Sequence, residues 1–149
     1  IIVLNFKNYN MIDKINIRVY AIYLNEKNEL MALDEGYVGE KLIKLPGGGL
    51  EFGEGTIECL HREFAEELNL KIEVLEHFYT QEDFLVSRFR DNEQLSTIYY
   101  LAGILNGQDL LGLDPCIERS EWFDLNGENP FQLPTDKRVF ELAKEKFLK

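Results

Sequence analysis

Three glutamates in the middle of the chain are spaced so that a helix would gather their carboxylates on one face. Glu63, Glu66 and Glu67 would lie within roughly 100° of one another, because an α-helix advances by about 100° per residue. Like charges this close repel, and a bound divalent cation would turn the repulsion into attraction. Since all the side-chain ligands are oxygens, Mg²⁺ or Mn²⁺ is favoured over zinc. An acidic helix face taken alone is more often simply solvated, so the neighbouring residues must decide.

An arginine and a glycine run accompany this cluster. Arg62 precedes Glu66 by four residues, the spacing of an ion pair that orients a carboxylate. Gly47, Gly48 and Gly49 allow the backbone to approach a ligand closely, and a carbonyl there can serve as a further metal ligand. A bare glycine run is more often a turn than a phosphate cradle. Its spacing from the acidic cluster is therefore the informative feature.

The spacing resembles the Nudix box over residues 48–70. The box reads glycine, five residues, glutamate, seven residues, Arg-Glu, an apolar residue, any residue, Glu-Glu, any residue, glycine and an apolar residue. The one departure is Asn69 in place of the final glycine. Asparagine is the next choice after glycine where a helix ends in a left-handed residue, so we expect a small cost in stability and no loss of activity. The matching residues are Gly48, Glu54, Arg62, Glu63, Glu66 and Glu67.

The resemblance implies a hydrolase that cuts a diphosphate linkage with the help of Mg²⁺ or Mn²⁺. In the family, the residues that match Glu63, Glu66 and Glu67 bind metal, together with a backbone carbonyl at the Gly47 position. The first of these glutamates is also the general base in some members. Water activated towards Glu63 would attack one phosphorus and release a monophosphate. The predicted catalytic residues are therefore Arg62 and these three glutamates.

The remaining site residues are less tightly predicted. Other family members take the base from a distal loop, so Glu93, Glu118 and Glu121 stay open as bases. We prefer Glu118, four residues before Trp122, as a distal metal ligand. A lysine or arginine in a loop is most often simply exposed to solvent. Substrate phosphates, however, would need cationic side chains as partners. The predicted substrate contacts are Gly48, Gly49, Lys44 and Arg88.

Around the cluster, the hydrophobic pattern predicts the elements that must position it. Residues 15–24 and 29–34 are predicted to form a hairpin through a turn at 25–28. A loop at 35–41 and a short apolar run at 42–45 follow, and the glycines are expected to stop regular structure. Residues 56–68 are predicted to form an amphipathic helix with Thr56 as its N-cap. Its expected buried stripe is Ile57, Leu60, Phe64 and Leu68.

The second half of the chain continues the same alternation. Residues 71–80, 95–105 and 121–125 are predicted strands, and 135–149 is a predicted helix. This order implies a Nudix-type α/β/α sandwich with a mixed sheet between helices. The polar stretch 81–94 is predicted to be a mobile hairpin over the site. Together with the loop at 35–41, it is expected to select the substrate.

The composition limits the partners. The chain of 149 residues suits one domain, with residues 1–10 as a possible N-terminal extension. A net charge of −11 without a basic stripe argues against nucleic acid, and no apolar run is long enough for a membrane span. Cys59 and Cys116 suit reduced thiols, so a cytoplasmic location is expected. Since Nudix enzymes are often dimers, a homodimer is also an open expectation.

Two functional alternatives follow. The leading one is hydrolysis of a small nucleoside diphosphate derivative, which could be a nucleoside triphosphate, ADP-ribose or a sugar nucleotide. These share the box, because the box binds the diphosphate and not its attachments. The rival is a noncatalytic nucleotide or ADP-ribose sensor with a Nudix-like domain. Such sensors often have a degraded box, whereas this chain keeps every box carboxylate.

Overall fold

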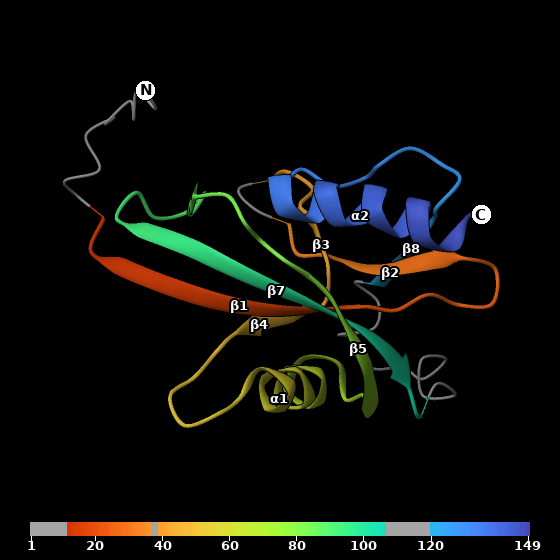
Figure 1. Cartoon of the computed structure of the whole chain (residues 1–149), viewed down its shortest axis with the longest axis horizontal. Coiled ribbons are helices and arrows are strands. Elements are labelled where there is room, and N and C mark those ends of the chain that lie inside the picture. Colours follow the sequence, from red (N-terminus) through yellow and green to blue (C-terminus); the bar gives the residue numbers. More distant parts are fainter. Residues whose placement is uncertain (1–11, 37–38, 107–119) are drawn as a thin grey trace.

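The computed structural model describes residues 12–36, 39–106 and 120–149. It confirms the predicted α/β/α architecture, with β-structure between two helices (Figure 1). No helix in the described part of the chain is long and apolar enough to cross a membrane. The elements are β1 (Lys14–Ile22), β2 (Glu29–Asp34), β3 (Ile43–Lys44), β4 (Gly47–Gly49), α1 (Thr56–Leu68), β5 (Ile72–Thr80), β6 (Leu85–Val86), β7 (Glu93–Ile104), β8 (Ser120–Asp124) and α2 (Pro134–Phe147).

The strands form two sheets. Sheet A has the order β4-β1-β7-β5, and β6 pairs with β7 beyond this path. Its β1 and β7 run parallel while the other pairs are antiparallel, which makes the sheet mixed as predicted. Sheet B has the order β3-β2-β8 and is antiparallel. In Figure 1, α1 lies on one side of the strands and α2 on the other.

Alternating side chains divide the interior into two cores. On β1, Val19 and Ala21 pack with the apolar side of α1, and Tyr20 and Ile22 pack with α2. The strand β2 alternates in the same way between the two cores. Because successive side chains of a strand point to opposite faces, one strand serves both helices. Whether a residue of β1 faces α1 or α2 therefore depends on whether its number is odd or even.

The predicted hairpin is correct at its turn and wrong in its extent. Asn25 accepts hydrogen bonds from the backbone of Lys27 and Glu29, which closes the turn. Ladder pairing between the two chain segments is limited to the bridge between Leu24 and Leu30. Beyond this bridge the strands enter different sheets, because β1 has β4 and β7 as its neighbours. Hydrophobic alternation alone cannot distinguish these pairings.

The glycine run is the second correction. It was expected to end regular structure, but Gly47–Gly49 forms β4 and pairs antiparallel with β1. Hydrogen bonds from Ala21 to Pro46 and from Leu50 to Ile17 extend this pairing on both sides. A ladder is made by backbone groups, so glycines can join one when the neighbouring strand accepts them. The expected break is therefore an edge strand.

The helix α1 matches the predicted range and differs in detail. Its N-cap is Gly55 rather than Thr56, and the Glu58 side chain accepts the Gly55 N–H at 3.2 Å. The Thr56 hydroxyl instead contacts the Tyr100 hydroxyl at 2.7 Å. Ile57 is 46% exposed, so its place in the buried stripe was wrong. The buried residues of the helix are Cys59, Leu60, Phe64 and Leu68.

The stretch 81–94 forms a partial hairpin. Leu85 and Val86 pair with Leu95 and Gln94, and β7 begins two residues earlier than expected. The predicted C-terminal helix is present as α2, with Val139 buried as expected. Both elements border the cavity described below. The hairpin thus borders this cavity, while its predicted mobility and its role over the site stay predictions.

Asn69 ends α1 in the left-handed conformation, with φ +52° and ψ +36°. We expect Asn69→Ala to lower the free energy of unfolding by about 1 kcal/mol, since a Cβ without a local hydrogen-bonding group is disfavoured there. Asn69→Gly should stay within about 0.5 kcal/mol of the wild type or exceed it. Urea denaturation measures both, with His61→Ala on the exposed helix surface as the control. Equal unfolding midpoints for Asn69→Ala and the wild type would contradict this account.

Candidate active site

The glycine strand β4 allows close approach from two sides. A Cβ on Gly48 would lie 2.3 Å from the Glu63 carboxylate, so the absent side chain leaves the space that this carboxylate occupies. Gly47 has φ +146°, and its Cβ would lie 2.1 Å from the Val19 carbonyl oxygen. Gly49 differs, because its Cβ would meet nothing closer than 3.6 Å. Two of the three glycines are thus required by close contacts.

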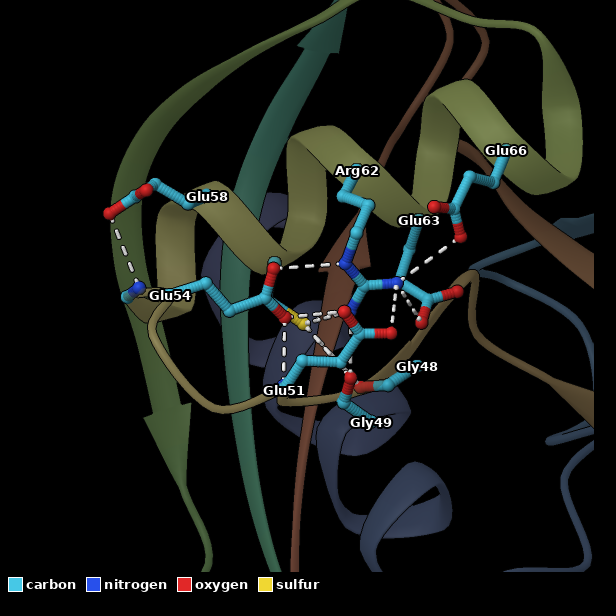
Figure 2. Close-up of polar contacts among 10 residues, drawn as sticks. Gly48, Gly49, Glu51, Glu54, Glu58, Arg62, Glu63 and Glu66 are labelled. Carbon is cyan, nitrogen blue, oxygen red and sulfur yellow. Dashed lines mark hydrogen bonds and ion pairs between the residues drawn. The ribbon is translucent and has the colours of Figure 1, made fainter.

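Arg62 joins the glycine strand to the helix (Figure 2). Its Nε and Nη2 donate to the two carboxylate oxygens of Glu54 at 2.9 and 2.6 Å. Nη2 also donates to the Gly49 carbonyl oxygen at 2.9 Å. Nη1 lies 3.1 Å from a Glu63 oxygen and 3.3 Å from a Glu66 oxygen. The predicted contact with Glu66 is present, but Glu54 is the bidentate partner.

The charges of this network shift the ionisation of its members. Hydrogen bonding to Arg62 lowers the pKa of Glu54 to about 2. Burial raises the pKa of Glu63, opposed by Arg62 and reinforced by the charges of Glu67 and Glu66. Burial, then the charge of Glu54, raises the pKa of the Cys59 thiol to about 12. Cys59 is therefore a small buried helix residue, as expected, and a poor nucleophile.

The three predicted carboxylates share one patch but differ in exposure. The Glu63 side chain is 13% exposed and that of Glu66 is 60% exposed. Glu67 is exposed and lies close enough to act on the charge of Glu63. Among the described residues, no three His, Cys, Asp or Glu side chains are already arranged to hold a metal ion. The patch brings the carboxylates near one another without fixing a ligand geometry.

A cavity of about 280 Å³ opens on the face of sheet A opposite α1. Its floor is formed by Arg18 and Tyr20 of β1, and the hairpin after β6 forms one wall. A second cavity of about 220 Å³ shares four lining residues with it and reaches the start of α2. We call the two together the groove. The shared residues are Tyr20, Arg88, Leu95 and Leu133.

The groove contains both predicted cationic substrate contacts. Lys44 lines it, lies 3.3 Å from a Glu35 oxygen and stands 5.2 Å from the centre of the Phe89 ring. Arg88 lines both cavities, and its ion pair with a described residue is a loose one, at 4.0 Å, with exposed Glu40. Among the described residues, neither Lys44 nor Arg88 forms a tight bidentate ion pair. Both are therefore placed to contact a ligand in the groove.

Sequence reasoning missed Arg18. Its guanidinium lies in the groove, and its Nε donates to the Tyr20 hydroxyl at 2.6 Å. Burial works against its charge but is outweighed by Tyr20, Glu35 and Glu63, so the pKa of Arg18 is raised. The usable signal was its parity, since it occupies the same face of β1 as buried Tyr20. A charged arginine on the face of a strand that is otherwise buried is unusual and points to a role. Because Arg18 is isolated in the sequence, however, it belongs to no recognisable motif.

The three distal acids have different positions. Glu93 lies in the groove, where Asn16 donates to it at 3.0 Å and Arg90 lies 3.8 Å away. Glu121 is on β8 and forms an ion pair with Lys41 at 2.8 Å. Glu118, the preferred distal ligand, lies outside the described residues. Of the acids that the structure describes, only Glu93 among these candidates faces the groove.

Comparison with known proteins decides the family. The model of the NUDIX domain matches residues 14–142, which is most of the chain. The chain belongs to the Nudix family. The predicted classification as a Nudix hydrolase, an enzyme that cleaves pyrophosphate linkages, is thereby confirmed. The family generally uses a divalent metal ion and acts on small nucleotide derivatives.

Solved structures show the same fold at low sequence identity. A NUDIX hydrolase from Nitrosomonas europaea is 18% identical, with a TM-score of 0.70 over 89% of this chain and 90% of that one. A MutT protein from Methanosarcina mazei is 20% identical, with a TM-score of 0.67 over 92% and 98%. An ADP-ribose pyrophosphatase from Streptococcus suis is 19% identical, with a TM-score of 0.58 over 87% and 90%. Proteins with these different names thus share one architecture with this chain.

The glycine contacts predict separate effects on fold and site. Gly47→Ala should lower the free energy of unfolding by about 3 kcal/mol, because its Cβ would meet β1 backbone at a left-handed φ. Gly48→Ala should cost less than about 1 kcal/mol but lower kcat/KM by about 100-fold, because the mobile end of Glu63 must move away. Urea denaturation and diphosphate hydrolysis measure the two effects. Gly49→Ala is the stability control, and a Gly47→Ala protein as stable as this control would refute the contact.

The Glu54–Arg62 pair predicts an acid-dependent loss of stability. Since the folded-state pKa of Glu54 is about 2, against an ordinary 4.5, its contribution is complete above about pH 4.5 and disappears as the pH falls towards 2. Glu54→Gln should be less stable than the wild type at neutral pH, and the difference should shrink in acid. Urea denaturation across this range measures it. The control is Glu26→Gln in the turn after β1, and a pH-independent difference would contradict the ion pair.

Proposed function

We propose that this Nudix protein hydrolyses the diphosphate linkage of a nucleoside diphosphate derivative with Mg²⁺ or Mn²⁺. The observation that carries the proposal is the Glu63 carboxylate, which packs over Gly48 beside Glu66 and Glu67, on the other side of the edge strand β4 from a cationic groove. The carboxylates without a metal ion would repel a diphosphate, and the cationic side chains of the groove by themselves would not activate water. A site with both can bind the substrate and cut it.

The donor set fits a hard divalent cation. Gly47 carbonyl, Glu63, Glu66 and Glu67 would hold it, all through oxygen. The packing of Glu63 over Gly48 supports this choice, because it aims a half-buried carboxylate at the glycine strand. When bound, the cation neutralises the diphosphate and stabilises charge on the departing phosphate oxygen. The exposed positions of Glu66 and Glu67 leave them room to turn towards an ion.

The residues of the chain would divide the work. Glu63 accepts the proton of the attacking water, since it is the least exposed of the three carboxylates in the patch. Arg62 positions Glu63 and Glu66 through its Nη1 atom. The backbone of Gly48 and Gly49 borders the diphosphate, and Lys44 and Arg88 contact the rest of the substrate from the groove. The products are a monophosphate and the remaining half.

The substrate class is left open by the fold. A similar structure is named a UDP-X diphosphatase, and others are named MutT or ADP-ribose pyrophosphatase. We include all three substrate types in the proposal. The groove, rather than the patch on α1, has to discriminate among them, because it receives the group attached to the diphosphate.

A hydrolysis panel tests the function. Nucleoside triphosphates, ADP-ribose, sugar nucleotides and dinucleoside polyphosphates are each incubated with Mg²⁺ and with chelator. We expect turnover of at least one class with Mg²⁺ only, and Glu67→Gln should abolish it while leaving the thermal unfolding profile unchanged. Loss of one carboxylate ligand weakens the neutralisation that the reaction needs.

The matched control is Glu145→Gln, which removes the same charge from the exposed surface of α2. It should retain wild-type turnover. Ligand binding without turnover in the wild type would instead support the noncatalytic sensor. Equal activity of Glu67→Gln and the wild type would remove the carboxylate patch from the chemistry.

A further inference from the structure

The groove has a charge opposite to that of the protein. Four cationic side chains line its larger cavity, where Glu93 is the one acidic side chain among the described lining residues, and Asp136 lines the smaller cavity. The whole chain has a net charge of −11. Arg18 comes from β1, Lys44 from β3 and the other two from the hairpin after β6, so the folded structure brings three separate segments together. They are Arg18, Lys44, Arg88 and Arg90.

Arg18 is the cation with the least local compensation. Within the described part of the chain, no carboxylate is close enough to form an ion pair with it, and its hydrogen bond is to the neutral Tyr20 hydroxyl. Lys44 and Arg90 each have a carboxylate within 4.0 Å. A half-buried guanidinium with unused donors favours an anionic ligand, because its fork of N–H groups matches an oxyanion.

The position of Arg18 relates the groove to the carboxylate patch. Arg18 pairs in register with Gly49, and its Nη1 lies 3.7 Å from the point where a Gly49 Cβ would stand. The Gly49 carbonyl oxygen accepts a hydrogen bond from Arg62, which also contacts Glu63. The two regions therefore meet across one residue of β4. Glu63 and Arg18 therefore approach the edge strand β4 from its two sides.

We propose that the substrate group held in the groove carries its own oxyanion, a phosphate or a carboxylate, in addition to the scissile diphosphate. Arg18 contacts it from the floor, and Arg88 and Arg90 contact it from the hairpin after β6. This inference rests on the proposed function and narrows its substrate class. A neutral sugar would leave the half-buried guanidinium of Arg18 without an anion in direct contact, which is unfavourable for a partly desolvated charge.

Two matched pairs of diphosphates test the inference by binding. UDP-glucose and UDP-glucuronate differ by one carboxylate, and NADH and NADPH differ by one phosphate. Calorimetry with the wild-type protein in metal-free buffer gives dissociation constants without turnover. We expect the charged member of at least one pair to bind at least tenfold more tightly. The pair that shows the preference identifies the oxyanion as carboxylate or phosphate.

Single variants assign the preference to the groove. Arg18→Gln and Arg90→Gln should each reduce the ratio of dissociation constants within that pair by about fivefold or more. Lys27→Gln, which removes a cation from the exposed turn after β1, should leave the ratio unchanged. Thermal unfolding of each variant verifies that it is folded. A general loss of stability would weaken the binding of both members of the pair alike, so it would not change the ratio of their dissociation constants.

The outcomes separate this inference from the proposed function. Equal binding within both pairs, or no binding of any of the four compounds, overturns the oxyanion site even if the protein hydrolyses other diphosphates. An unchanged preference in both arginine variants also overturns it. A preference that depends on Arg18 and Arg90, without Mg²⁺-dependent hydrolysis of any compound, supports the oxyanion site while refuting the proposed function.

Discussion

The bidentate contact between Arg62 and Glu54 sets the relation between the glycine strand and the helix. The two groups are eight residues apart, with Glu54 near the end of the loop that leads into α1 and Arg62 on the helix itself. The same guanidinium holds the Gly49 carbonyl and the Glu63 carboxylate. With a side chain only 20% exposed, Arg62 is screened less than a surface arginine would be. The single position of Arg62 therefore holds the glycine strand, the loop before α1 and the Glu63 carboxylate together.

The charge distribution on the two sides of β4 follows from strand parity. Gly48 meets Glu63 of α1, whereas its neighbours in the ladder meet Arg18 and Tyr20 of β1. A thin edge strand without side chains thus separates an acidic patch from a cationic groove. In a protein of net charge −11, the groove gives an anionic substrate a local region of favourable potential. The acidic surroundings then disfavour longer polyanions that cannot enter it.

The sequence sufficed for the parts of the fold and site that depend on local spacing. The helix 56–68, its left-handed end at Asn69 and the grouping of Glu63 with Arg62 are set by residues close in sequence. The pairing of β1 with β7 and the strand character of Gly47–Gly49 depend on distant partners, so hydrophobic alternation missed them. Arg18 was missed for the same reason. Its meaning arises only when the hairpin after β6 brings other cations beside it.

The glycine strand also needs support at its other end, because it has no side chains with which to anchor itself. Buried Asp136, at the start of α2, accepts the Leu45 N–H at 3.4 Å and the Tyr99 hydroxyl at 2.6 Å. Tyr99 stacks on Tyr20, whose hydroxyl accepts from Arg18. Burial raises the pKa of Asp136 to about 6, so these donors stabilise a carboxylate that is costly to ionise. This buried network holds the chain just before β4 and the floor of the groove together, as Arg62 holds the chain beyond it. The strand can therefore remain in place without side chains of its own, which leaves its backbone open to the ligand that we propose.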